Sequence, residues 1–194
     1  MFKIWKGATY GQPENGPKTL ILGESHYGYH HDTYGYALED KSILCVTNHM
    51  NGWKHRYFTN IVSTVTGKYP TLEEKRTFWN SVCFHDLITT PLSGPGVAPT
   101  FDQWNVSIPT LQRVIAEVDP EFLVVVCSRM WDRVSTLDYF EALPAQYPVG
   151  MKPAKRLKPT GAVAVSTKHP SRFYSWRKYH PHIQFGKLLL ARTV

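Results

Sequence analysis

Polar side chains capable of acid–base chemistry stand at the ends of three apolar runs. Glu24 follows the first run, Asp86 closes the second, and His169 follows the last. A carboxylate can stabilise a cation or activate water, and an imidazole can donate a hydrogen bond to developing negative charge. If these runs are parallel strands of one sheet, their carboxyl ends meet at one edge, and the three residues share a crevice.

Hydrophobic periodicity predicts the elements that would position these residues. The predicted strands are residues 18–22, 82–88, 121–127 and 162–167, and the predicted helices are residues 52–65, 73–80, 104–118, 128–134 and 177–192. The stretch 25–40 lacks a period and is predicted to be a long loop. Strands that alternate with helices favour an α/β fold, here one three-layer α/β/α domain over residues 1–194 with a central four-stranded parallel sheet.

Composition narrows the class of protein. The chain has 194 residues, of which 42% are hydrophobic, and no apolar run approaches the roughly 20 residues that a membrane-spanning helix needs. No secretory signal precedes the first strand, so we expect a cytoplasmic monomer without membrane contact. We also expect no cofactor and no metal, because the spacing of His26, His30 and His31 fits no structural zinc pattern. The cysteines are expected to be reduced.

The charge of the chain favours a polyanionic partner. Lys and Arg number 22 against 15 Asp and Glu, which gives a net charge of +7. Many of these basic residues gather between residues 152 and 178. Such a cluster can track a phosphate backbone, although it can also be a solvated surface.

Two short motifs resemble those of the uracil-DNA glycosylase superfamily. GESHYG at residues 23–28 follows the first predicted strand, and HPSR at residues 169–172 follows the last. Family members pair a glycine-rich motif and a His-Pro-Ser motif at these two places. The resemblance implies a DNA glycosylase, with Glu24 acting on water or on the sugar cation and His169 stabilising the departing base.

The sequence departs from the family at the residue that reads the flipped base. The family commonly carries an Asn in the second strand, whereas the matching stretch offers Asp86; Asn80 lies farther from the end of that strand. An ionised Asp only accepts hydrogen bonds, which suits the exocyclic amine of a cytosine. We therefore expect a modified cytosine as the target, as in phage DNA, and hence a role in defence.

The resemblance also suggests which residues surround the base and the DNA. Phe84 is a candidate stacking platform, although a core position is the alternative, and Tyr27 could line the pocket. The residues expected to contact DNA are Ser171, Arg172, Lys155, Arg156, Lys158 and Lys168.

Other functions remain open at this point. Repair of uracil in DNA is the nearest alternative. Residues 23–27 nearly form the G-x-S-x-G elbow of α/β-hydrolases, with Ser25 as nucleophile and Asp86 and His169 following in chain order, but Tyr27 replaces the last glycine. A non-enzymatic nucleic-acid-binding module is the third reading, against which the carboxylate of Glu24 argues.

Overall fold

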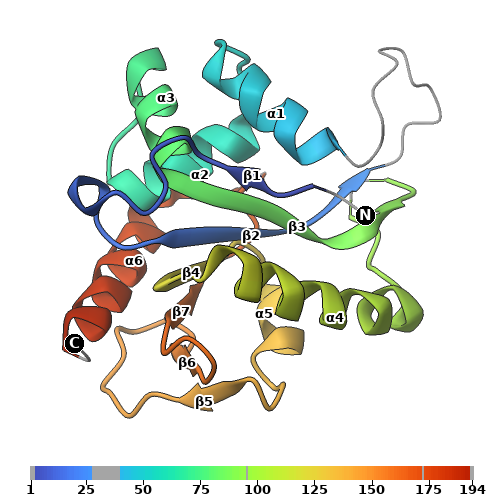
Figure 1. Cartoon of the computed structure of the whole chain (residues 1–194), viewed down its shortest axis with the longest axis vertical. Coiled ribbons are helices and arrows are strands. Elements are labelled where there is room, and N and C mark those ends of the chain that lie inside the picture. The colour runs from blue at the N-terminus through green and yellow to red at the C-terminus, as the bar shows by residue number, and fades with distance from the viewer. Residues whose placement is uncertain (1–2, 28–39, 95, 172, 193–194) are drawn as a thin grey trace.

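The computed structural model describes residues 3–27, 40–94, 96–171 and 173–192, and these residues form a mixed α/β fold. Its sheet has seven strands in the order β1-β3-β2-β4-β7-β6-β5 (Figure 1). The strands are β1 (Trp5–Lys6), β2 (Thr19–Tyr27), β3 (Val82–Leu92), β4 (Phe122–Val125), β5 (Phe140–Ala142), β6 (Lys155–Leu157) and β7 (Val163–Ser166).

The prediction of a four-stranded sheet is wrong in its strand number. The four predicted strands do form the parallel centre of the sheet, as β3, β2, β4 and β7. Three antiparallel strands extend it: β1 beside β3, and β6 and β5 beyond β7. Each of these contains two or three residues, which is too short to show a strand period in the sequence.

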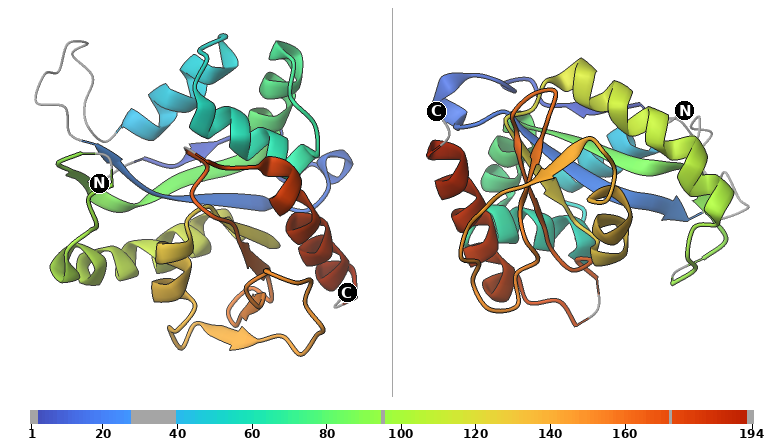
Figure 2. Two further views of the ribbon diagram at one scale, coloured as in Figure 1. Left: turned by 180° about the vertical axis from the view of Figure 1, so that it is seen from behind. Right: turned by 90° about the horizontal axis from the view of Figure 1, so that it is seen from below.

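Helices cover both faces of the sheet. Figure 1 shows α1, α2 and α3 on one side and α4 and α5 on the other, and α6 packs against α2 and β7 (Figure 2). The helices are α1 (Lys41–Met50), α2 (Arg56–Thr66), α3 (Leu72–Ser81), α4 (Phe101–Val118), α5 (Ser128–Val134) and α6 (Trp176–Ala191), with a 3₁₀ turn, η1, at Pro13–Asn15. None of the helices within the described ranges is long and apolar enough to cross a membrane.

The core lies in two clusters, one on each face of the sheet. Alternate residues of β2 contribute to opposite clusters, Leu20 and Leu22 to the side of α4, and Ile21 to the side of α2. This alternation follows from the two-residue period of a strand. Both faces of the central strands are therefore buried, as their nearly continuous apolar sequences require.

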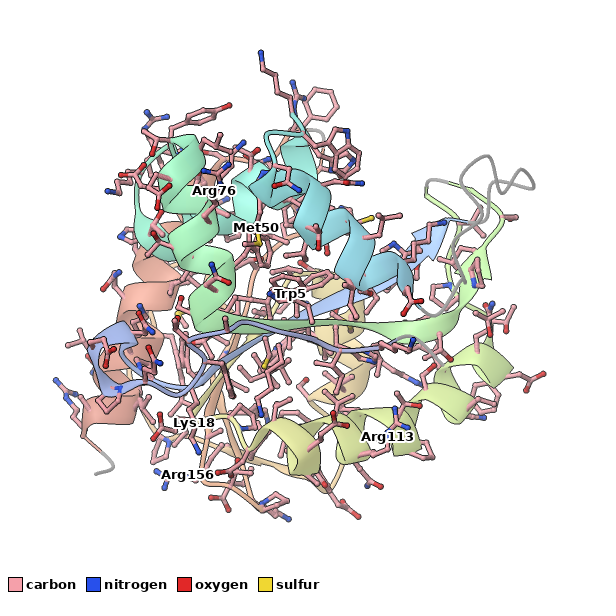
Figure 3. The ribbon with its side chains drawn as sticks, turned by 45° about the horizontal axis from the view of Figure 1, so that its top comes forward. Trp5, Lys18, Met50, Arg76, Arg113 and Arg156 are labelled. Atoms are coloured by element: carbon pink, nitrogen blue, oxygen red, sulfur yellow. The ribbon has the colours of Figure 1, made fainter. Side chains whose placement is uncertain are left out.

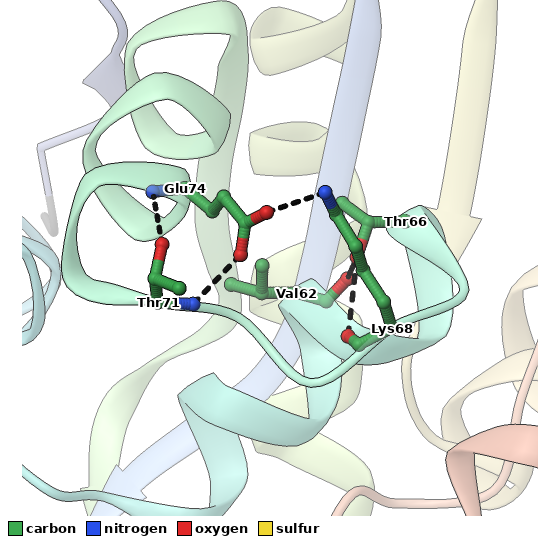
Figure 4. Close-up of polar contacts among 5 residues, drawn as sticks. All are labelled: Val62, Thr66, Lys68, Thr71 and Glu74. Atoms are coloured by element: carbon green, nitrogen blue, oxygen red, sulfur yellow. Dashed lines mark hydrogen bonds and ion pairs between the residues drawn. The ribbon is translucent and has the colours of Figure 1, made fainter.

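A capping box begins α3. The Thr71 hydroxyl accepts the backbone N–H of Glu74 at 3.3 Å, and the Glu74 carboxylate accepts the backbone N–H of Thr71 at 2.7 Å (Figure 4). Lys68 adds an ion pair to the Glu74 carboxylate. These contacts satisfy N–H groups that would otherwise lack a partner at the start of the helix, and they fix the approach of the chain to β3.

The order of the strands locates a crevice. From β2, the chain adds β3 on one side and then β4 and β7 on the other, so the winding direction reverses between β2 and β4. Ligands of open parallel sheets bind at the carboxyl ends of the strands at such a reversal. The strand β2 extends beyond the predicted residue 22 to Tyr27, with an irregularity in register after Ser25, so Glu24 lies within the strand.

Candidate active site

Glu24 lies at this reversal and is held by side chains from beyond β4. Its carboxylate is 6% exposed. From the first turn of α5, Arg129 donates from Nε to Oε1 at 2.8 Å and from Nη2 to Oε2. The Cys127 thiol also donates to Oε1, at 3.4 Å. Such a forked pair fixes both the position and the orientation of the carboxylate.

The thiol of Cys127 is a stable donor to this carboxylate. Burial and the neighbouring charge of Glu24 raise the pKa of Cys127 to about 11. The group therefore remains protonated at neutral pH, and it serves as a polar wall of the site rather than as a nucleophile.

His169 follows β7 and lies beside Tyr57 of α2, with ring centroids 5.1 Å apart. Burial lowers the pKa of His169, and the charges of Glu24 and Asp86 oppose that shift without cancelling it. The imidazole is therefore neutral at pH 7, with one donor and one acceptor nitrogen. Within the described chain its side chain makes no hydrogen bond, and the residue is partly exposed.

Asp86 lies on the other face of the sheet edge, in a polar cluster with His26 and Ser42. Its Oδ2 is 2.8 Å from His26 Nε2 and accepts the Ser42 hydroxyl at 3.1 Å. Burial raises the pKa of Asp86, but the charge and the hydrogen bond of His26, together with smaller contributions from His85 and Ser42, outweigh burial and hold it below its usual value. This carboxylate is consequently ionised at neutral pH.

Gly23 explains why Asp86 can approach the first strand so closely. A Cβ atom at this position would lie 2.2 Å from Asp86 Oδ1 and 2.9 Å from the hydroxyl of Tyr57. Any larger residue would push these groups away from β2. Gly23 therefore sets the spacing between the two strands' polar side chains, directly before Glu24.

The structure places Phe84 in the core and not at a base-binding position. Its side chain has no exposed surface, and its ring packs 5.7 Å from that of Phe58 and 5.8 Å from that of Trp79. No face of the ring remains for stacking on a base. The side chain of Tyr27 and the whole of Arg172 lie outside the described residues.

The loop after His169 presents an apolar tip. Phe173 is 96% exposed and has a positive φ of 57°, which is unusual for a residue with a side chain. The Asn60 side chain of α2 donates to the carbonyl of Pro170 at 3.1 Å, and Tyr174 bonds the Thr64 hydroxyl at 2.8 Å. The loop is thus tied to α2 on both sides of its tip. The predicted DNA contacts Lys168 and Ser171 are both exposed in this loop.

Two of the predicted DNA-binding residues lie away from this site. In β6, Lys155 and Arg156 pair with Ala164 and Val163 of β7, and Lys158 follows beyond. Because β6 is antiparallel to β7, the chain runs there toward the amino ends of the central strands. Arg156 and Lys158 therefore lie toward the opposite edge from Glu24. Their predicted contacts with DNA stay a prediction.

The site also contains residues that sequence reasoning missed. Arg129 follows a predicted strand, so the rule that pointed to the other residues would also have identified it. Tyr57 and Ser42 carry no comparable signal, because their roles depend on how α1, α2 and β2 pack. His26 stands in the GESHYG motif after the first predicted strand, but its pairing with Asp86 was not predicted. Among the described residues no group of His, Cys, Asp and Glu is arranged for a metal ion.

The chain matches no protein-family model and no curated protein. The function must therefore be argued from the arrangement of these residues.

Proposed function

We propose that this protein is a DNA glycosylase of the uracil-DNA glycosylase type, built as a three-layer α/β/α domain. It hydrolyses the N-glycosidic bond of a flipped, modified cytosine-type base and leaves an abasic site. The observation that carries the proposal is that the charges of both Glu24 and Asp86 act on His169, at the edge of the sheet where its winding reverses. The glycine-rich and His-Pro-Ser motifs of the sequence support the same assignment.

The position of Glu24 suits the sugar side of the reaction. Water adds to C1′ and loses a proton, while the electrons of the C–N bond leave with the base, which takes up a proton after departure. Positive charge therefore develops on the sugar and negative charge on the base in the transition state. A carboxylate fixed by Arg129 stabilises that cation without reorganising during the reaction. Because Arg129 compensates the negative charge of Glu24, the carboxylate also repels DNA phosphates near the site less strongly.

His169 suits the base side of the reaction. A neutral imidazole with free nitrogens can donate one hydrogen bond to the base oxygen on which negative charge collects. The nearby ring of Tyr57 restricts the orientation of the imidazole. This donor needs no proton transfer, because the hydrogen bond alone lowers the energy of the departing anion.

Asp86 and His26 form the base-reading part of the proposal. An ionised carboxylate accepts but cannot donate, which matches the exocyclic amine of a cytosine and not the carbonyl that uracil has there. Asp86 is 2% exposed, and the His26 side chain, which is 11% exposed, is the more accessible partner. We therefore assign recognition to the pair rather than to Asp86 alone.

Phe173 fits the task of extruding the base. Flipping a nucleotide costs a few kcal/mol of lost stacking, and an apolar side chain that enters the vacated space can offset part of it. Phe173 is almost fully exposed, on a loop that also carries His169 and Lys168. The same loop would thus hold the duplex open and place the imidazole on the base.

The serine-hydrolase alternative has weaker geometric support. Asp86 bonds His26 rather than His169, and the Ser25 side chain makes no hydrogen bond within the described residues. Ser42, which does contact His26, is completely buried and has no access to a substrate.

The test of the proposal is base release from a panel of DNAs containing uracil, cytosine, hydroxymethylcytosine or glucosylated hydroxymethylcytosine. We expect free base and abasic sites from a modified cytosine. Release from the glucosylated base would support defence against phage, and release of uracil alone would favour repair. Tight DNA binding without any base release, or cleavage of ester substrates that Ser25→Ala abolishes, would overturn the proposal.

A further inference from the structure

A pocket lies at the opposite end of the sheet from Glu24. Its volume is about 520 Å³, and it is lined by residues that precede the central strands, together with the last turns of α6. Pro17 precedes β2, Glu121 precedes β4 and Ala162 precedes β7. Arg156 also lines the pocket. Figure 3 labels Arg156 and, near it in this view, Lys18, the residue before β2. The length of the strands separates this pocket from the proposed active site.

Lys187 gives this pocket an uncompensated positive charge. The side chain lies on α6, a helix without a single acidic residue, so no carboxylate one turn away can pair with it. Within the described residues it makes no ion pair and no hydrogen bond. Burial lowers the pKa of Lys187. A desolvated ammonium without a partner is unfavourable, and an anion bound beside it would remove that cost.

The other charged groups of the pocket leave the balance positive. Arg156 adds a second cation, whose Nε is 3.6 Å from the carboxylate of Glu141, a distance that leaves the rest of its guanidinium available. Among the described residues that line this pocket, Glu121 is the one acidic residue. Its Oε2 accepts the backbone N–H of Lys18 at 2.8 Å, which compensates part of its charge.

We propose that this pocket binds a small phosphate-bearing ligand whose phosphate is contacted by Lys187 and Arg156. A volume of about 520 Å³ falls within the usual range of roughly 300–1,000 Å³ for small-molecule sites. The apolar atoms of Pro17, Ala162 and Leu190 would contact the remainder of the ligand. The phosphate belongs either to a free phosphate ester or to a DNA backbone, and the site is independent of the proposed glycosylase activity.

Thermal unfolding in inorganic phosphate tests this proposal, with chloride at equal ionic strength as the reference. We expect phosphate to raise the melting temperature of the parent by about 2–4 °C at saturation. Lys187→Met should melt higher than the parent without phosphate and gain nothing from it. Lys54→Met, at an exposed lysine in another part of the molecule, should respond like the parent.

Further variants keep the test decisive. If Lys187→Met does not fold, Arg156→Met should still lose the response to phosphate, and Glu121→Gln should lower the phosphate concentration needed for half the effect. A deoxynucleoside monophosphate and a short oligonucleotide without a target base distinguish the two sources of the phosphate. An equal response to phosphate in the parent and in Lys187→Met, or no response in the parent, would overturn the proposal.

Discussion

The two carboxylates of the candidate active site are nearly buried, yet their partners differ in kind. Glu24 is held by Arg129, which is always charged and whose side chain is 42% exposed. Asp86 is held by His26 and by the fully buried Ser42. One carboxylate therefore has an exposed partner, and the other belongs to a largely buried network in which His26 is the more accessible member. The difference assigns chemistry to the side of Glu24 and discrimination between bases to the side of Asp86.

Removal of the imidazole on the chemistry side should have a large effect. We expect His169→Ala to slow single-turnover base release by roughly 10²–10³-fold, because the departing anion loses its hydrogen-bond donor. The single-turnover rate of Ser25→Ala should remain within about threefold of the parent rate, because a substitution outside the catalytic groups usually has a small effect. Comparable losses in both variants would point to a serine mechanism.

A change at Asp86 should alter the choice of base more than the chemistry. Asp86→Asn replaces an acceptor with a group that also donates, so we expect the ratio of cytosine-type to uracil release to fall about 10-fold or more. The ratio of kcat/KM on the two DNAs measures this. A uniform loss on both substrates would instead show that Asp86 only maintains the fold of its cluster.

Arg129 should act through Glu24 and produce a smaller effect. We expect Arg129→Gln to lower kcat by about 10-fold with little change in KM, because Glu24 loses its fixed orientation. Arg129→Lys should recover part of this loss, since a single ammonium cannot reproduce the fork. A rise in KM at constant kcat would identify Arg129 as a contact to DNA phosphate.

His85 should affect stability and its pH dependence, without a direct role in catalysis. It is completely buried, neither ring nitrogen has a hydrogen-bond partner among the described residues, and burial lowers its pKa to about 4. The unfolded chain binds a proton near its ordinary pKa of 6.5, whereas the folded chain does not, so stability falls between pH 6.5 and 4. The loss amounts to about 3 kcal/mol at most.

The matched variant is His85→Leu. We expect it to be more stable than the parent by about 1–2 kcal/mol at pH 7.5, because two unpaired nitrogens leave the core. The difference between variant and parent should grow as the pH falls to 5. Denaturant unfolding at both pH values measures it, and a difference that is constant or shrinks with acid would refute the assignment.

The sequence predicts the central strands well and the edges poorly. β4 and β7 are apolar on both faces and therefore visible as continuous runs, and α5 begins and ends at the predicted residues. β5 and β6 contain three residues each and gain their hydrogen bonds from neighbours, so no local pattern reveals them. The prediction missed the helix α1, which lies between the predicted loop and the first predicted helix.

The candidate site divides in the same way. The rule that polar residues at strand ends face a common crevice selects Glu24, Asp86 and His169. It does not reveal that Asp86 lies on the other face of the sheet edge from Glu24. Arg156 lies away from this site for a topological reason, because the antiparallel pairing of β6 with β7 reverses the direction of the chain. Phe84 is a core residue, since alternation on β3 directs it toward Phe58 and Trp79. The positions of Arg156 and Phe84 depend on how elements distant in the sequence pack together, and not on how close these residues are to the motifs in the sequence.

The most direct test of the account is single-turnover base release by Glu24→Gln on the DNA that the parent cleaves. Glu117→Gln, at an exposed position of α4, serves as the matched control. We predict a loss of about 10²–10⁴-fold in Glu24→Gln with unchanged DNA binding, and parental rates in the control. Parental base release by Glu24→Gln would contradict the central claim that this carboxylate performs the chemistry.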